Sequence, residues 1–301
     1  MGQKGLLTSV IIPTYNRSWG LVNAINSVLS QTYGNFELVI VDDQSDDDTT
    51  EVIQRYNDPR IKYFRNETRL GMVGNWGKGL NLARGELFSF LMDDDQLRPD
   101  FLSHRVEIMA SDPSIVVTFS NYERIDREGN PLGANQKEME KIVMDSYGLL
   151  RAAISRMWFV GASVYRTSLV KNCWDAVKND DLVLDFSLNI QLSLIKHTKG
   201  VYLPDKDFLM MEHPGQNSKA KLGKVLEQTE GVLKRMCLDP NVPYKEKKLM
   251  KQELANWRVL WGREMLKHGD KAGAQKKLWK AIQTSPSLIY AWKTLVKSFI
   301  S

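Results

Sequence analysis

Apolar runs alternate with amphipathic stretches along the first 120 residues. Five short apolar runs have the length and composition of strands, at residues 9–13, 36–41, 61–65, 87–92 and 115–120. The segments between them carry apolar residues at helical spacing, which predicts helices at residues 18–31, 49–56, 71–83 and 101–110. Strands that alternate with helices in this way predict an α/β fold, a mostly parallel sheet with helices on its faces.

The pattern is less regular after residue 120. It predicts a turn at 127–131, strands at 159–165, 201–203 and 208–212, and helices at 168–177 and 185–197. After Pro214 the chain is rich in Lys, Leu, Trp and Met, which indicates an α-helical C-terminal extension. Residues 271–284 and 287–300 predict one helical hairpin of the kind that stacks in helical repeats.

Charge divides the chain in the same place. Residues 1–214 hold 23 basic and 29 acidic residues, a net charge of −6, whereas residues 215–301 hold 18 and 7, a net charge of +11. The basic part suits an anionic membrane surface or nucleic acid, but no recognised nucleic-acid motif accompanies it. No apolar run reaches 18 residues, and the N-terminus has no signal-peptide pattern. We expect a cytoplasmic protein, peripheral at most at the inner face of the membrane, with no nucleic-acid partner.

Acidic residues gather at the ends of two predicted strands. Asp42 and Asp43 follow the second strand, and Asp93, Asp94 and Asp95 follow the fourth. Ligands of open parallel sheets bind outside the carboxyl ends of the strands, so both clusters are expected at one edge. Carboxylates without nearby thiols or imidazoles suit Mg²⁺ or Mn²⁺, which complete their shells with phosphate oxygens and water. A phosphate-bearing substrate is therefore predicted; the alternative is that these residues cap helices or are simply solvated.

A series of short motifs occurs in a fixed order. They are SVIIPTYNR at 9–17, SVLSQTY at 27–33, ELVIVDDQSDDDT at 37–49, residues 66–71, Gly85-Glu86, the acidic triplet at 93–95 and Pro99-Asp100. Their order and spacing resemble the family 2 glycosyltransferases of the GT-A fold over about residues 8–218. The resemblance implies a catalytic domain at 1–218, with a nucleotide-binding half at about 1–120 and an acceptor half at about 121–218. Residues 219–301 remain as a basic helical C-terminal region.

The resemblance also assigns donor-binding residues in the loops after the strands. They are Pro13, Thr14, Tyr15, Asn16, Asp43, Arg69 and Asp93. Tyr15 would pack on the base, unless it is a rim aromatic packed on the first helix. Asp43 would accept the N3–H of uracil or thymine, a donor that cytosine lacks. Asp93 would bind the ribose or help to place the metal, and Arg69 would reach the base or phosphates, unless it is a solvated surface residue.

The metal and the catalytic base are assigned in the same way. Asp94 would ligate Mn²⁺ or Mg²⁺, although Met92 stands where many members carry another Asp. His213, in the segment EHPGQNS at 212–218, would face the metal or the diphosphate, with a structural histidine as the alternative. Asp185 would be the general base that accepts the proton of the acceptor hydroxyl. Asp180 and Asp181 are competitors, and Asp185 can also serve as a helix N-cap.

Together these features predict an inverting, metal-dependent glycosyltransferase that uses a UDP-sugar or a dTDP-sugar. The acceptor is expected to be a carbohydrate or a lipid-linked molecule in cell-surface polysaccharide or glycolipid synthesis. Trp158 is expected to line the acceptor cleft, unless it is a core residue. The C-terminal tryptophans indicate peripheral membrane contact through 219–301 or packing on the catalytic domain. A non-catalytic protein that binds a nucleotide-sugar or carbohydrate on the same fold is the alternative function.

Overall fold

The computed structural model describes residues 5–134, 139–213 and 222–300. The chain forms two compact units, Met1–Pro214 and Gly215–Ser301. The predicted domain boundary between residues 218 and 219 lies outside the described residues, as does the predicted motif segment at 215–218. Each unit is therefore considered by itself.

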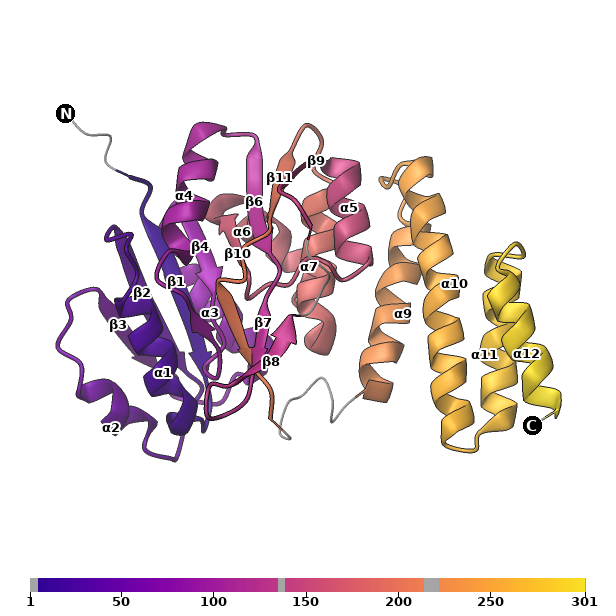
Figure 1. Ribbon diagram of the computed structural model, residues 1–301, viewed down its shortest axis with the longest axis horizontal. Helices are drawn as coiled ribbons and strands as arrows, with labels where there is room; N and C mark the ends of the chain where they lie inside the picture. The colour runs from indigo at the N-terminus through magenta and orange to yellow at the C-terminus, as the bar shows by residue number, and fades with distance from the viewer. Residues whose placement is uncertain (1–4, 135–138, 214–221, 301) are drawn as a thin grey trace. The chain divides into compact units, whose positions relative to one another are not determined.

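An eight-stranded sheet forms the centre of the first unit (Figure 1). Its spatial order is β3-β2-β1-β4-β10-β6-β11-β9, and six of the eight strands run in one direction. The strands are β1 (Thr8–Thr14), β2 (Phe36–Asp42), β3 (Ile61–Arg65), β4 (Leu87–Phe90), β6 (Ile115–Ser120), β9 (Ile142–Asp145), β10 (Ser163–Arg166) and β11 (Lys199–Leu203). Every residue of β1, β2, β4 and β6 is buried, which explains why their sequences are mostly apolar.

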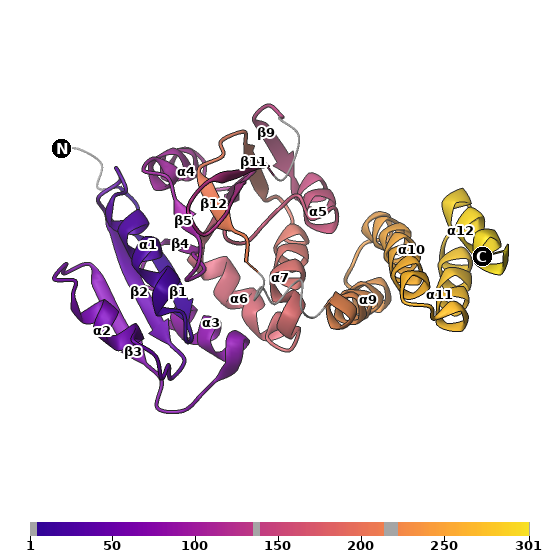
Figure 2. The ribbon, with the colours of Figure 1, turned by 60° about the horizontal axis from the view of Figure 1, so that its bottom comes forward.

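Helices cover both faces of this sheet (Figure 2). On one face Val10 and Ile12 pack with residues of α1 (Ser18–Leu29), α2 (Thr49–Gln54) and α4 (Phe101–Ser111). On the other face Ile11 meets Gly79 of α3 (Gly71–Leu82), where an added Cβ would lie 2.5 Å from the Ile11 side chain. The helices of the later half are α5 (Ser146–Ile154), α6 (Thr167–Val177) and α7 (Leu184–Ser193), the last preceded by the short 3₁₀ helix η1 (Asp181–Val183).

The later half differs most from the sequence expectation. The predicted strand at 159–165 begins only at Ser163, because Phe159 packs on Phe208 with ring centroids 5.6 Å apart instead of joining the sheet. The predicted helix at 185–197 ends at Ser193. A second sheet in the order β5-β12-β7-β8 was not predicted as such; its strands are β5 (Gln96–Leu97), β7 (Glu123–Ile125), β8 (Pro131–Ala134) and β12 (Phe208–Met211).

Two buried groups stabilise the later half of the first unit. Trp158 is buried and stacks on Phe119, with ring centroids 5.3 Å apart, which supports the alternative that it is a core residue. Arg105 of α4 is fully buried and holds Asp207 through two bonds, of 2.5 Å from Nη1 to Oδ2 and 2.8 Å from Nη2 to Oδ1. These two hydrogen bonds join α4 to the segment that precedes β12.

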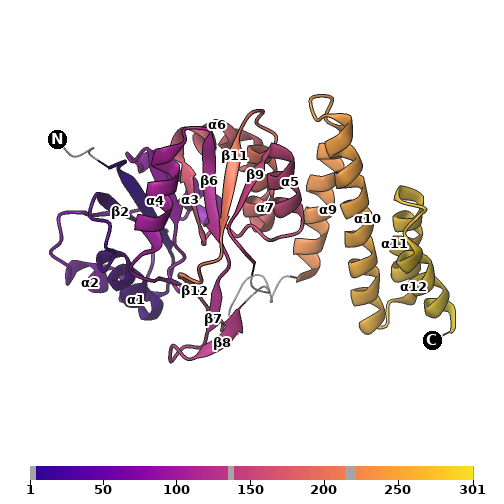
Figure 3. The same cartoon turned by 45° about the horizontal axis from the view of Figure 1, so that its top comes forward.

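The second unit consists of helices that lie side by side in chain order (Figure 3). They are α9 (Leu222–Leu238), α10 (Tyr244–Lys267), α11 (Lys271–Thr284) and α12 (Ile289–Ile300). The last two form the predicted hairpin. Buried Glu230 of α9 holds three cations, Lys234, Lys277 and Arg258. Burial raises the pKa of Glu230, but the hydrogen bonds from these cations outweigh it and lower that pKa to about 2. Among the described residues, no helix is long and apolar enough to span a bilayer.

Candidate active site

Asp43 lies buried where β2 ends and anchors the start of α3. Its Oδ1 accepts hydrogen bonds from Asn66 Nδ2 at 2.9 Å and from the backbone N–H of Leu70 at 2.7 Å, and its Oδ2 accepts the Gly71 N–H at 2.8 Å. A carboxylate offers about four acceptor positions. Three are occupied, so Oδ2 keeps the capacity for one further donor.

Asn16 holds the loop after β1 against the loop after β2. Its Nδ2 donates to Asp46 at 2.5 Å, its Oδ1 accepts the Asp46 N–H at 2.9 Å, and its backbone N–H donates to Ser45 Oγ at 2.9 Å. Pro13 and Thr14 are buried within β1. The structure thus gives these three predicted donor-binding residues a place in positioning the loops, and direct contact with a donor stays a prediction.

Tyr15 and Arg69 lie together beside Asp43. The Arg69 guanidinium carbon stands 3.6 Å from the centre of the Tyr15 ring, and Arg69 Nε is 4.0 Å from Asp43 Oδ2. The Arg69 side chain is more than half exposed, whereas the Asp43 carboxylate is buried. A planar group that stacks on the same ring face would have to displace Arg69 or lie over it.

Asp93 and Asp94 form the second acidic group, after β4. Arg17 Nη1 lies 3.1 Å from Asp93 Oδ1 and 2.7 Å from Asp94 Oδ2, and His213 Nε2 lies 2.9 Å from the same Asp94 oxygen. Burial raises the pKa of Asp93 to about 6, with Arg17 acting in the opposite direction and Asp94 adding to the increase. Arg17 therefore offsets the repulsion between the two carboxylates. Arg17 was quoted within the first motif but not given a role, since its partners lie 76 and 77 residues away.

Asp95, the third carboxylate of the triplet, ties the donor half to the end of the first unit. Its Oδ1 accepts the Met211 N–H at 2.9 Å, which brings β12 and His213 against the loop after β4. Trp19 packs edge-on against the His213 ring, with ring centroids 5.4 Å apart. Gly20 allows the first turn of α1 to approach the same loop, because a Cβ there would stand 2.7 Å from the Asp93 carbonyl oxygen. The sequence alone gave no sign of the roles of Trp19 and Gly20.

Asp185 lies in the first turn of α7. The N-cap of that helix is Val183, so the capping alternative for Asp185 is wrong. Strand β10 is antiparallel to β4, so it ends at the opposite edge of the sheet from β4. Helix α6 follows β10 and leads the chain back across the sheet. Helix α7 therefore starts at the edge where β1, β2 and β4 have their carboxyl ends. Asp185 is half-buried, and among the described residues it has neither a hydrogen-bond donor nor an ion-pair partner. Asp180, its competitor, is engaged by the Ser187 hydroxyl.

Comparison with known protein families identifies the first unit. The family model described as "Glycosyl transferase family 2" matches residues 9–172, more than half of the chain. The chain belongs to glycosyl transferase family 2. The sequence resemblance is thereby confirmed, and so is the GT-A type of fold, on which the solved structures below agree.

Curated relatives of this family 2 glycosyltransferase include two bacterial enzymes. The GalNAc(5)-diNAcBac-PP-undecaprenol beta-1,3-glucosyltransferase of Campylobacter jejuni is 37% identical over 169 residues, which cover 54% of this chain and 53% of the relative. The UDP-Glc:alpha-D-GlcNAc-diphosphoundecaprenol beta-1,3-glucosyltransferase of Escherichia coli is 36% identical over 120 residues, covering 40% and 47%. The matches thus span about half the length of these relatives.

Solved structures share the fold of this glycosyltransferase at low identity. S. aureus TarS has a TM-score of 0.71 and 19% identity, covering 98% of this chain and 89% of that chain, and a TarS structure with UDP-GlcNAc has a TM-score of 0.70. The mannosyltransferase PcManGT of Pyrobaculum calidifontis, in complex with GDP-Man and Mn²⁺, has a TM-score of 0.63 and 17% identity, covering 99% and 81%.

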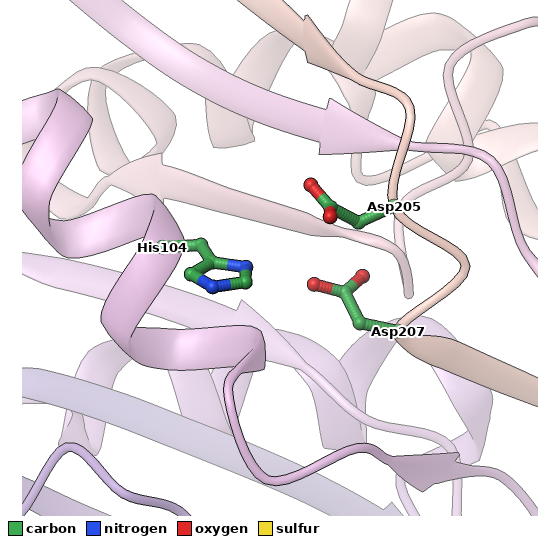
Figure 4. A group of neighbouring side chains, drawn as sticks. All are labelled: His104, Asp205 and Asp207. Atoms are coloured by element: carbon green, nitrogen blue, oxygen red, sulfur yellow. The ribbon is translucent and has the colours of Figure 1, made fainter.

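In the part of the chain that the structure describes, two places are compared as metal sites. Asp94 and His213 present one carboxylate oxygen and one imidazole nitrogen in a buried, acidic setting, a donor set that fits Mn²⁺ better than the all-oxygen shell preferred by Mg²⁺. The other group is His104, Asp205 and Asp207 (Figure 4), the one set of three in the described part of the chain whose ligand atoms lie within 4.8 Å of one another. There Arg105 is fully buried and neutralises Asp207 through two hydrogen bonds, which disfavours a cation, whereas the Arg17 side chain that contacts Asp94 is 25% exposed and has room to turn away. The Asp94 position is the better fit.

Proposed function

We propose that this chain transfers a sugar from a UDP-sugar, or a dTDP-sugar, to a hydroxyl group of a carbohydrate or lipid-linked acceptor, with inversion and with the help of Mn²⁺ or Mg²⁺. The observation that carries the proposal is the convergence of three carboxylate groups at one sheet edge. Asp43 has one open acceptor position, Asp94 is paired with His213, and Asp185 has no hydrogen-bond or ion-pair partner in the described part of the chain. They correspond to the base, the diphosphate and the acceptor hydroxyl of such a reaction.

The nucleotide end follows from Asp43. A uracil or thymine ring can donate its N3–H to the open position on Asp43 Oδ2, whereas the N3 of cytosine is an acceptor and would face a carboxylate oxygen. Tyr15 supplies a ring face for stacking, and Arg69 lies over it, ready to cover the bound base or reach a phosphate. The TarS complexes with UDP-GlcNAc and with UDP, and the UDP-Glc in the name of the E. coli relative, support a uridine carrier.

The leaving group follows from the second cluster. Asp94 and His213 would hold a divalent ion, which, when bound, neutralises the charge that develops on the departing diphosphate. Arg17 contacts the same Asp94 oxygen and would turn toward the phosphates as that oxygen binds the ion. Asp93 lies next to these groups and is placed for the ribose hydroxyls or for a water in the metal shell.

The chemical step is a single displacement. The acceptor oxygen bonds to the anomeric carbon as the bond from that carbon to the phosphate oxygen breaks, and the nucleoside diphosphate leaves with the electron pair. The acceptor proton passes to Asp185, whose carboxylate has no hydrogen-bond or ion-pair partner among the described residues to compete for it. The undecaprenol-linked substrates named for the two bacterial relatives support a lipid-linked acceptor in polysaccharide or glycoconjugate synthesis.

The first test is thermal unfolding in the presence of UDP, dTDP, GDP or CMP, with and without Mn²⁺. A ligand at one hundred times its Kd adds about 2.7 kcal/mol to the free energy of unfolding, so a metal-dependent increase in Tm with UDP or dTDP is expected. The absence of any nucleotide effect on the folded protein would overturn the donor site.

The second test replaces the proposed base. Asp185→Asn should leave the UDP effect intact and lower the rate of sugar transfer about 10²–10⁴-fold, because a positioned base contributes that much. Asp181→Asn, four residues earlier in the same segment, is the matched control and should retain transfer. Loss of transfer in Asp181→Asn with retention in Asp185→Asn would instead assign the base to Asp181.

A further inference from the structure

The last helix of the chain has an apolar outer face. Ile289, Trp292, Val296 and Phe299 of α12 are 68%, 42%, 55% and 70% exposed. At 3.6 residues per turn their side chains project within about 80° of one another. The opposite face is buried, where Ala291 and Leu295 pack on α11. An exposed helix face of a soluble protein is normally polar, so this stripe, here called the α12 face, requires a partner.

Lysines border the α12 face. Lys293 and Lys297 follow the stripe along one side at one-turn spacing, and both are exposed. The aromatic surface continues onto α11 through Trp279, which is 49% exposed and meets Trp292 edge-on at 6.0 Å. Residues 271–300 contain six lysines and no acidic residue. An apolar stripe with aromatic residues and a border of lysines is the pattern of a helix that lies in a membrane interface.

Three residues of the α12 face, Ile289, Trp292 and Val296, also line a groove that contains basic residues. This groove of about 460 Å³ between α10 and α12 is lined by Arg263, Tyr290, Lys293 and Lys297 among others. The Arg263 guanidinium lies over the Tyr290 ring at 4.1 Å. Three cations around one shallow groove would attract the phosphate of an anionic lipid head group, with each basic residue near such a surface contributing about 1 kcal/mol.

We infer that the α12 face docks this enzyme on an anionic phospholipid surface. A second copy of the chain fits the same face less well, since a symmetric contact would bring two identical lysine-rich and acid-free surfaces together. The inference rests on the proposed function in one respect: a lipid-linked acceptor gives the docking its purpose. Lipid binding itself requires neither donor nor transfer, and it can be measured without them.

The experiment is co-sedimentation of the full chain with vesicles of phosphatidylethanolamine and phosphatidylglycerol, compared with phosphatidylcholine vesicles. Wild type should bind the anionic vesicles, and added salt should weaken binding. Lys293→Gln with Lys297→Gln should lower partitioning about 30-fold, since two lysines contribute about 2 kcal/mol. Trp292→Ser with Phe299→Ser should also release the protein. Leu238→Ser with Tyr244→Ser is the control, because these residues are 82% and 81% exposed elsewhere in the same unit, and it should bind like wild type.

Results of two kinds would overturn the inference. One is wild-type protein that stays in solution with anionic vesicles, or binding that the α12 variants and the control lower equally. The other is a dimer in sedimentation velocity that the Trp292→Ser and Phe299→Ser changes dissociate, which would assign the face to a second copy. UDP-dependent stabilisation in the same variants reports on the donor site separately, so failure of docking and failure of the proposed function are distinguishable.

Discussion

Exchanging one atom of Asp43 should change which nucleotide the enzyme binds. In Asp43→Asn the amide oxygen is expected at the Oδ1 position, because Asn66 and the Leu70 N–H both donate there. The amide NH₂ then takes the place of Oδ2, the oxygen that accepts the Gly71 N–H in the wild-type protein. The group facing the base changes from an acceptor to a donor. It would oppose the N3–H of uracil and match the acceptor N3 of cytosine.

The magnitude follows from the bond that is lost. A hydrogen bond to a charged acceptor contributes about 1.5–3 kcal/mol, so the Kd for UDP should rise about 10- to 150-fold. The Kd for CDP should fall, in contrast to the Kd for UDP. The same change leaves the Gly71 N–H facing a donor, which should lower the free energy of unfolding by about 1–3 kcal/mol. Calorimetric titration with UDP and CDP in Mn²⁺ measures the first effect, and chemical denaturation measures the second.

Asp42→Asn is the matched control for this change. Asp42 is the preceding residue and is equally buried, but its carboxylate accepts hydrogen bonds from the Ser45 N–H and the Tyr63 hydroxyl. It should affect stability without altering the preference between UDP and CDP. If Asp43→Asn binds UDP within threefold of wild type and gains nothing for CDP, Asp43 does not read the base.

Three further predictions concern other charged groups. Asp207→Ala should lower the free energy of unfolding by about 3–5 kcal/mol in denaturant titrations, because it leaves buried Arg105 unpaired, and adding Arg105→Met should recover much of the loss. The folded-state pKa of Glu230 is lowered, so the stability that its carboxylate contributes is present above about pH 4.5 and is lost as the pH falls toward 2. Glu230→Gln should remove this part of the pH dependence, which amounts to at most about 3 kcal/mol. Unfolding measured as a function of pH checks this. Asp94→Asn should abolish the effect of Mn²⁺ on UDP affinity and leave metal-free UDP binding nearly unchanged, which titration with and without the ion will show.

The donor half was predictable because its signals are local. Each buried strand reads as an apolar run, and each loop after a strand carries the residues that the fold brings to one edge, as with Asp43 and Asp94. In the later half the helix at 168–177 and the strands at 201–203 and 208–212 were also predicted. The strands β7, β8 and β9 were missed, since they are short and partly exposed and so lack such a run. Arg17 shows a second limit. Its sequence neighbours do not reveal which carboxylates, far along the chain, it will meet.

The contact between His213 and Asp94 has a consequence for the order in which the protein folds during synthesis. It joins residues 119 positions apart, so it closes more than half of the first unit into one loop. Contacts of such long sequence separation form late, after the local strand and helix pairs that shorten the effective loop. During synthesis the nucleotide-binding strands leave the ribosome well before His213 does. The residues proposed to bind the base would thus be made before the proposed metal site, and that site would be completed only once His213 has been made.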